Sequence, residues 1–148
     1  ASVKINTIKE QPFLVLCIDR DNDLYEKAKV SGPLIGRKQN LDGATKLAIA
    51  DPEEPDANVM FYGIKLYDKM RAKGLSVEIV TLTGSKDLGY KSDFEISSQL
   101  DEIMSTINPK SAVLVTDGMS DEEIIPVIRS RILIDSTRVI FIKQAKEL

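Results

Sequence analysis

A continuous apolar run that stops abruptly at alternating carboxylates is the feature that most constrains the fold of this chain. Residues 13–18 are all apolar, and Asp19, Asp21 and Asp23 follow them closely. A short run of this kind is typical of a strand that is buried on both faces of a parallel sheet. Because ligands of open α/β sheets lie outside the carboxyl ends of the strands, the run predicts a functional site at these acids.

The rest of the chain alternates between strand and helix patterns, which predicts a single α/β domain over residues 1–148. Strands separated by helices imply a parallel sheet with right-handed crossovers, so we expect a three-layer Rossmann-like domain with a mainly parallel central sheet of about five strands. The expected strands are 13–18, 76–82 and 112–116, and the expected helices are 41–50, 57–73 and 93–107. Residues 132–134 and 139–142 are predicted to form two further strands, as a hairpin around 135–137.

The residues between the first strand and the first expected helix are predicted to form one long loop. Leu34 and Ile35 are unusual in a loop, and they favour either a lid over the site or a contact surface for a partner. Pro52 and Pro55 separate the next two helices, because two prolines this close cannot continue a helix. Asp56 is expected to cap the second of these helices.

The amino-acid composition excludes several kinds of site. The chain has no histidine and one cysteine, Cys17, so catalysis by a histidine-assisted nucleophile is not expected, and neither are zinc, haem or iron–sulfur centres. A bound metal would have oxygen ligands, which favours Mg²⁺, Mn²⁺ or Ca²⁺. The formal net charge of −3 argues against a general binder of nucleic acids or membrane surfaces. Cys17 is expected to be a small buried hydrophobe within the first strand.

The acids that follow the strands are the predicted metal ligands. Asp19, Asp21 and Asp23 follow the first strand and Asp117 follows the third, so these carboxylates converge if the two strands are neighbours. A divalent cation would relieve their mutual repulsion, and without one a carboxyl pKa must rise. The alternative interpretation is a polar loop in which the aspartates form turns and helix caps.

Two glycine-containing loops, residues 32–37 and 83–86, are candidates for binding an anion. Backbone amides in such turns form anion-binding nests, and Arg37 in the first loop and Lys86 in the second supply positive charge. Thr83 and Ser85 belong to the second loop. Neither loop has a Walker or a dinucleotide-binding glycine pattern. We therefore predict a small anionic ligand at Arg37, Thr83, Ser85 and Lys86, with ordinary surface loops as the alternative.

The strand followed by an Asp-x-Asp pattern resembles the haloacid-dehalogenase phosphatases. The resemblance implies that Asp19 is the nucleophile and Asp21 the general acid, which makes these two the candidate catalytic residues. Asp23 departs from the family pattern, in which Thr or Val is usual at this position. The resemblance further implies a hydroxyl from Thr81 or Thr83, a phosphate-binding lysine from Lys86 or Lys110, and late magnesium ligands in Asp117 and Asp121.

Seven segments, 16–24, 32–37, 50–53, 83–87, 116–118, 126–131 and 134–136, together resemble an archaeal family called domain of unknown function 373. The resemblance implies an archaeal integral membrane protein whose N-terminal soluble domain precedes several membrane helices, so this chain is expected to be that soluble part. The family carries no established activity. Tyr25 departs from the glycine that the family leads us to expect after Leu24.

Three functions are compatible with this sequence. We favour an uncharacterised ligand- or divalent-metal-binding domain at the cytoplasmic face of the cell membrane, with a small anionic ligand and its own membrane segment as partners. The alternative is a Mg²⁺- or Mn²⁺-dependent phosphoester hydrolase or phosphoryl-transfer enzyme, with Asp19, Asp21 and Asp117 on the metal and Lys86 and Arg37 on phosphate. The third is a non-catalytic assembly module, a homodimer in which the acids only cap helices.

Overall fold

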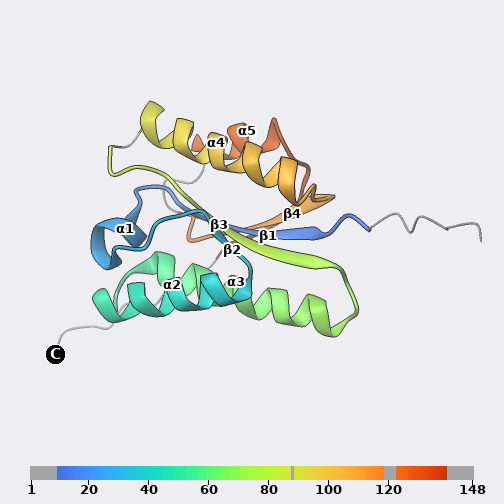
Figure 1. Cartoon of the computed structure of the whole chain (residues 1–148), viewed down its shortest axis with the longest axis horizontal. Coiled ribbons are helices and arrows are strands. Elements are labelled where there is room, and N and C mark those ends of the chain that lie inside the picture. The colour runs from blue at the N-terminus through green and yellow to red at the C-terminus, as the bar shows by residue number, and fades with distance from the viewer. Residues whose placement is uncertain (1–9, 88, 119–122, 140–148) are drawn as a thin grey trace, which may run out of the picture.

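The computed structural model describes residues 10–87, 89–118 and 123–139, and it confirms the predicted α/β fold (Figure 1). Five strands form one sheet in the order β2-β3-β1-β4-β5, with helices on both faces. In chain order the elements are β1 (Phe13–Asp19), α1 (Asp23–Ala28), β2 (Leu34–Ile35), α2 (Arg37–Ala50), α3 (Pro55–Ala72), β3 (Val77–Thr83), α4 (Tyr90–Thr106), β4 (Ser111–Thr116), α5 (Ile125–Arg129) and β5 (Ile134–Val139).

The sheet is parallel except for the short strand β2. β1 lies at its centre and pairs in parallel with β3 on one side and β4 on the other, while β5 continues the parallel order next to β4. Asp19 is opposite Thr83 on β3, and Cys17 is opposite Val115 on β4. The neighbouring strands β3, β1 and β4 therefore end at one side of the sheet, which we call the carboxyl edge.

The central strand is buried on both faces, which explains its continuous apolar sequence. Leu14, Leu16 and Ile18 pack toward α4 and α5, and Val15 and Cys17 pack toward α2 and α3. Figure 1 shows the same arrangement, with α4 and α5 over one face and α2 and α3 over the other. The expected burial of Cys17 is confirmed, since its side chain is 0% exposed.

Helix α3 lies directly on the centre of the sheet because Gly63 has no side chain. A β-carbon at Gly63 would lie 2.7 Å from the sulfur of Cys17, closer than real β-carbon contacts. α3 precedes the parallel strand β3, so it runs opposite to the strands. Its first turn is therefore at the carboxyl edge, and its last turn is at the other end of the sheet.

The predicted hairpin near the end of the chain is wrong. Residues 134–139 form one strand, β5, parallel to β4, so residues 135–137 belong to the strand rather than to a turn. Residues 140–142 lie outside the part that the structure describes. The Asp135 carboxylate accepts a hydrogen bond from Ser111 Oγ at 2.5 Å, and Thr137 is exposed. The sequence of these polar residues resembles a turn, but the residues belong to an exposed edge strand of the sheet.

The predicted long loop after β1 is also wrong, because it contains α1 and β2 and ends where α2 begins at Arg37. Leu34 is 5% exposed and pairs with Thr81 of β3, so Leu34 and Ile35 form an edge strand and not a lid. Asn40 ties this strand to α2: its Nδ2 donates to the Leu34 carbonyl at 3.2 Å, and its Oδ1 accepts from Thr81 Oγ1.

The outer side of β3 at the carboxyl edge is closed by a side chain instead of a strand. Gln99 of α4 accepts a hydrogen bond from the Thr83 N–H at 2.8 Å and donates one to the Thr83 carbonyl at 3.0 Å. β2 covers only Val80 and Thr81 of β3. The Gln99 amide thus makes the two bonds that a longer β2 would have made.

Candidate metal site at the carboxyl edge

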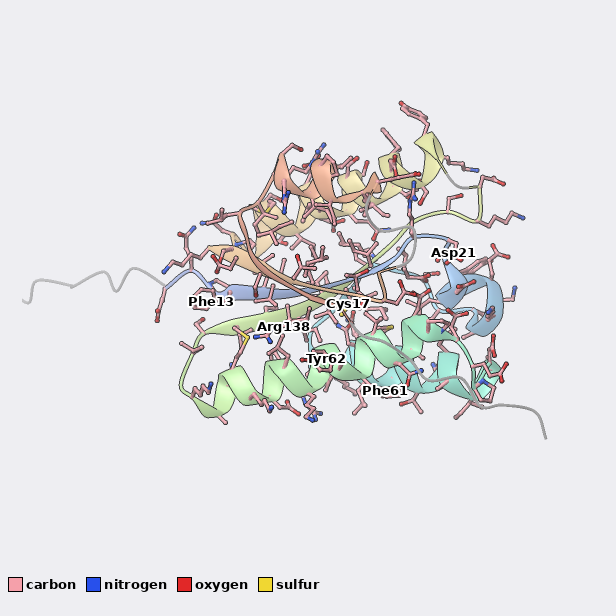
Figure 2. The ribbon with its side chains drawn as sticks, turned by 180° about the vertical axis from the view of Figure 1, so that it is seen from behind. Phe13, Cys17, Asp21, Phe61, Tyr62 and Arg138 are labelled. Atoms are coloured by element: carbon pink, nitrogen blue, oxygen red, sulfur yellow. The ribbon has the colours of Figure 1, made fainter. Side chains whose placement is uncertain are left out.

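Four carboxylates converge at the carboxyl edge, from Asp19, Asp21, Asp23 and Asp56. One oxygen of each lies within 4.8 Å of the corresponding oxygens of the others. Two ligands on opposite sides of one cation are separated by twice the metal–oxygen distance, about 4.2 Å for Mg²⁺ and about 4.8 Å for Ca²⁺. The spacing of this acidic cluster therefore fits a single hard cation. Figure 2 shows Asp21 beside α1 at this edge.

Asp19 is the fixed member of the acidic cluster. It is the last residue of β1 and is 1% exposed. Its two carboxylate oxygens accept backbone hydrogen bonds from the N–H groups of Asp23 at 3.0 Å and Leu24 at 2.9 Å. These amides belong to the first turn of α1, where helix N–H groups have no partner within the helix. The local sequence thus holds the Asp19 carboxylate in one place, and these two hydrogen bonds oppose the rise in its pKa that burial causes.

A tight turn brings Asp21 and Asp23 back toward Asp19. Asn22 has φ 61°, in the left-handed region that asparagine adopts more readily than most residues. Its N–H donates to the Asp19 carbonyl at 3.2 Å, which closes the turn directly after β1. The alternating acids that were predicted to form the site are therefore grouped by the local backbone.

Asp56 is the member that sequence reasoning missed. α3 begins at Pro55 and is capped by Glu54, whose side chain accepts from the Asp56 N–H at 3.3 Å, so the prediction that Asp56 is the cap is wrong. The Asp56 carboxyl instead forms a hydrogen bond with that of Asp19. An acid in the first turn of a helix is favourable by itself, so its sequence context gave no separate sign of a metal site.

The pKa values of three members of the acidic cluster, Asp19, Asp23 and Asp56, are raised. Burial is the main cause for Asp19 and Asp23, whose pKa values rise from 3.8 to about 7. Burial, followed by the charge of Asp19, raises the pKa of Asp56 far above its usual range. Asp56 therefore holds a proton and donates it toward Asp19. A divalent cation among these oxygens would replace the proton as the source of positive charge.

The ion pairs of Lys27 do not involve the four members of the acidic cluster. Lys27 of α1 is bound by Asp51, at 2.7 Å, and by Glu54. Hydrogen bonding to Asp51 is the main reason that the pKa of Lys27 rises, and the same bond lowers the pKa of Asp51. Lys27 is thus engaged by two carboxylates outside the acidic cluster.

The structure does not bring every predicted ligand into the acidic cluster. Asp117 follows β4, a direct neighbour of β1, but it is not one of the four grouped carboxylates. Arg37 lies at the start of α2 and forms a two-pronged ion pair with Asp68 of α3, at 2.9 Å and 3.0 Å. Lys86 is exposed in the loop after β3. Their predicted roles in metal or anion binding stay predictions.

Thr83 and Ser85 line a polar hollow of about 340 Å³ next to the acidic cluster. Asn22 and Lys91 also line it, and Asn22 belongs to the turn that carries Asp21 and Asp23. Pockets for small molecules usually have volumes of about 300–1,000 Å³, so this hollow is large enough for a small polar ligand. Two of the four residues predicted to bind an anion therefore share one cavity.

The structure places only some of the residues implied by the phosphatase resemblance at the carboxyl edge. Thr83 is directly opposite Asp19 across the β1–β3 pair, as a hydroxyl next to the acid would require. Lys110 comes before β4, at the opposite edge of the sheet, with its ammonium nitrogen 5.3 Å from the centre of the Phe13 ring. Asp121 lies outside the described residues.

The fold and the acidic cluster together define an α/β domain with a mainly parallel sheet and a candidate hard-cation site at its carboxyl edge. The chain belongs to the family described as "Domain of unknown function (DUF373)", which matches residues 12–148. The family resemblance is therefore confirmed.

Two archaeal relatives are similar to this chain, and both are described only as uncharacterised proteins. The protein of Archaeoglobus fulgidus is 44% identical over 135 residues, which cover 91% of this chain and 39% of the relative. That of Methanocaldococcus jannaschii is 35% identical over 137 residues, covering 92% and 37% respectively. No solved structure matches the chain. Among the described residues, no helix is both long and apolar enough to cross a bilayer.

Proposed function

We propose that this domain binds one hard divalent cation, Mg²⁺ or Mn²⁺, through Asp19, Asp21, Asp23 and Asp56. The observation that carries this proposal is the convergence of four carboxylate oxygens within 4.8 Å around the buried end of β1. Carboxylates this close repel each other, and a divalent cation compensates that repulsion. The absence of histidine and the single buried cysteine leave oxygen as the only ligand type for such an ion.

The four ligands come from three elements, so cation binding would connect them. Asp19 is fixed at the end of β1 by the α1 amides, and Asp56 approaches from the first turn of α3. Asp21 comes from the turn between β1 and α1, and Asp23 is the first residue of α1. Mg²⁺ usually keeps several water molecules, and the acids in the turn leave room for these on the solvent side. Binding would stabilise the contact between β1, α1 and α3.

The proposal is tested by calorimetric titration of Mg²⁺ and Mn²⁺ into metal-free protein. We expect one ion per chain, with affinity lower by at least about tenfold in Asp19→Asn and in Asp56→Asn, because each variant removes a ligand charge. Asp42→Asn is the matched control, since Asp42 is exposed on α2. Circular dichroism establishes that each variant is folded. The absence of binding to the unmodified protein, or an equal loss in Asp42→Asn, would falsify the proposal.

Phosphoester hydrolysis is a second candidate function, and the polar hollow beside the acidic cluster favours it. Lys91, Ser85 and Thr83 line this hollow and could hold a phosphate group. Bound Mg²⁺ would supply Lewis-acid activation of the phosphoryl group. Asp19 is 1% exposed, so in this function it would hold metal rather than attack a substrate. Turnover of p-nitrophenyl phosphate that requires Mg²⁺, and that Lys91→Gln abolishes without loss of Mg²⁺ binding, would support hydrolysis. Binding without turnover would leave the cation-binding function alone.

We also infer that the domain works as part of a longer protein at the cytoplasmic face of a membrane. The support is that this chain spans only 39% and 37% of the two archaeal relatives, together with what the family resemblance implies. Fractionation of archaeal cells with an antibody against this domain tests the location. Recovery of a longer protein in the membrane fraction is the expected result, and recovery in the soluble fraction would contradict it.

A further inference from the structure

A second hollow, on the side of the sheet covered by α3, is lined by four cationic side chains. It has a volume of about 290 Å³ and lies between the C-terminal half of α3 and the edge strand β5. Figure 2 shows Tyr62 and Arg138 close together between α3 and the sheet. We call this the basic hollow. Its cations are Lys65, Lys69 and Lys73 of α3 and Arg138 of β5.

These four cations have no acidic partner in the part of the chain that the structure describes. Within residues 10–87, 89–118 and 123–139, the side-chain ion pairs within 4 Å involve other cations. Elsewhere on the domain some cations are paired, such as the exposed Arg37 with Asp68 and the half-buried Arg131 with Asp101. The basic hollow therefore concentrates unbalanced positive charge on a chain whose net charge is −3.

The helix dipole accounts for only part of this arrangement. Cations in the last turn of a helix are favourable, which suits Lys69 near the end of α3 and Lys73 just after it. Lys65 lies further back in the helix, and Arg138 comes from a different element. Like charges four residues apart on a helix destabilise it, and the three lysines have this spacing. A bound anion would compensate the repulsion.

The shape of the basic hollow defines the class of anion. Lys73 is eight positions after Lys65, which places their backbones about 12 Å apart along the helix axis, so the basic hollow is long enough for more than one phosphate group. Lysine binds phosphate as a point charge, and arginine binds it through two parallel hydrogen bonds. Tyr62 and Met70 add less polar walls. We propose that the basic hollow binds a small molecule that carries two or more phosphate groups.

The test is a calorimetric titration of inorganic triphosphate into the protein in the presence of EDTA, which separates this site from cation binding. We expect one triphosphate per chain, with affinity at least about tenfold lower in Lys65→Gln/Lys69→Gln and in Arg138→Gln. The matched control is Lys38→Gln/Lys46→Gln, which removes the same charge from exposed positions on α2. We expect this control to change the affinity by less than about twofold.

Three results would overturn the proposal. The first is no saturable binding of triphosphate to the unmodified protein. The second is a loss of affinity in the α2 control, or in Lys91→Gln of the polar hollow, as large as the loss in Lys65→Gln/Lys69→Gln. The third is tighter binding of polyuridylate than of triphosphate, which would identify a surface for nucleic acid. Because the four cations are exposed, their substitution should leave the fold intact, and melting curves establish this for each variant.

Discussion

The two ends of α3 carry clusters of opposite charge, and the clusters are built in different ways. At the N-terminal end, Asp56 meets Asp19, which is buried and held by two backbone amides. At the other end, Lys69 and Lys73 are exposed on long side chains beside Arg138 of a different strand. Repulsion inside the protein is strong because the surroundings polarise weakly, whereas repulsion at the surface is screened by water and salt.

This difference shows where unbalanced charge matters for the fold. The acidic cluster is coupled to the ends of β1, α1 and α3, so its protonation and its occupancy by a cation should change the free energy of unfolding. The basic hollow is formed by side chains that move easily, so its charge should affect ligand binding much more than stability. Three predictions test this comparison, beginning with the contact that holds both ends of α3 on the sheet.

The largest effect is expected from Gly63→Ala in the middle of α3. The new methyl group would lie 2.7 Å from the Cys17 sulfur, within the core between α3 and β1. Overpacking of this kind costs about 1–3 kcal/mol, and the helix preference of alanine offsets up to about 1 kcal/mol. We expect a net loss of about 1–2 kcal/mol in the free energy of unfolding, measured by urea denaturation.

The control for this prediction is the same substitution in a Cys17→Ala background, where the sulfur is absent. The destabilisation by Gly63→Ala should then be smaller, as a double-mutant cycle would reveal. An equal loss in both backgrounds would mean that contact between α3 and β1 at Gly63 does not limit the position of the helix.

The acidic cluster should make metal-free protein less stable as the pH rises. The pKa values of Asp19 and Asp23 are about 7 in the folded protein and near 3.8 when unfolded, so the folded state binds more protons between these values. The free energy of unfolding therefore falls as the pH rises from about 4 to about 7. At pH 8 the Asp56 carboxyl must take up a proton when the protein folds, whereas asparagine needs none, so we expect Asp56→Asn to stabilise metal-free protein at pH 8 by at least about 1 kcal/mol.

Urea denaturation in EDTA at pH 5 and at pH 8 measures both effects. Asp42→Asn on α2 is the control and should follow the unmodified protein at both values. If stability rises with pH, or if Asp56→Asn destabilises the protein at pH 8, folding does not raise the pKa values of these acids as the structure indicates. Saturating Mg²⁺ should reverse the order, so that the unmodified protein becomes more stable than Asp56→Asn.

The smallest effect on stability is expected from Lys65→Gln/Lys69→Gln in the basic hollow. Removing two like charges four residues apart should stabilise the protein by no more than about 0.5 kcal/mol at low salt. In about 0.5 M NaCl the difference should disappear, because screening removes the repulsion. Thermal denaturation at both salt concentrations measures it, with Lys38→Gln/Lys46→Gln as control. A destabilisation above about 1 kcal/mol would mean that these lysines have structural partners.

The sequence predicted the sheet because burial leaves a direct pattern. β1 and β4 are continuous apolar runs, and their expected bounds differ from the observed ones by only one residue at an end. β2 has only two residues, too few for any periodicity to be recognised. β5 was mistaken for a turn and its flanks because residues 135–138 are all polar and exposed.

Only those members of the acidic cluster that are close together in the sequence were predictable. Asp19, Asp21 and Asp23 follow one another closely in the chain, so their grouping is visible in the sequence. Asp56 joins them only because α3 packs against the sheet through Gly63, which is a tertiary relation. Asp117 lies just beyond the last residue of β4, whereas Asp19 is the last residue of β1 and pairs with Thr83 of β3. Neighbouring strands alone do not place every acid of an edge in one group.

The side chain of Gln99 has a consequence for how this edge meets other polypeptides. Unpaired backbone groups at the side of a strand are a template on which a second chain can add and aggregate. At Thr83 the glutamine amide occupies both groups without placing further backbone there. The polar hollow beside it is still lined by hydroxyl and amide groups, so small solutes can reach this edge. A second polypeptide strand, in contrast, cannot pair with β3 at Thr83.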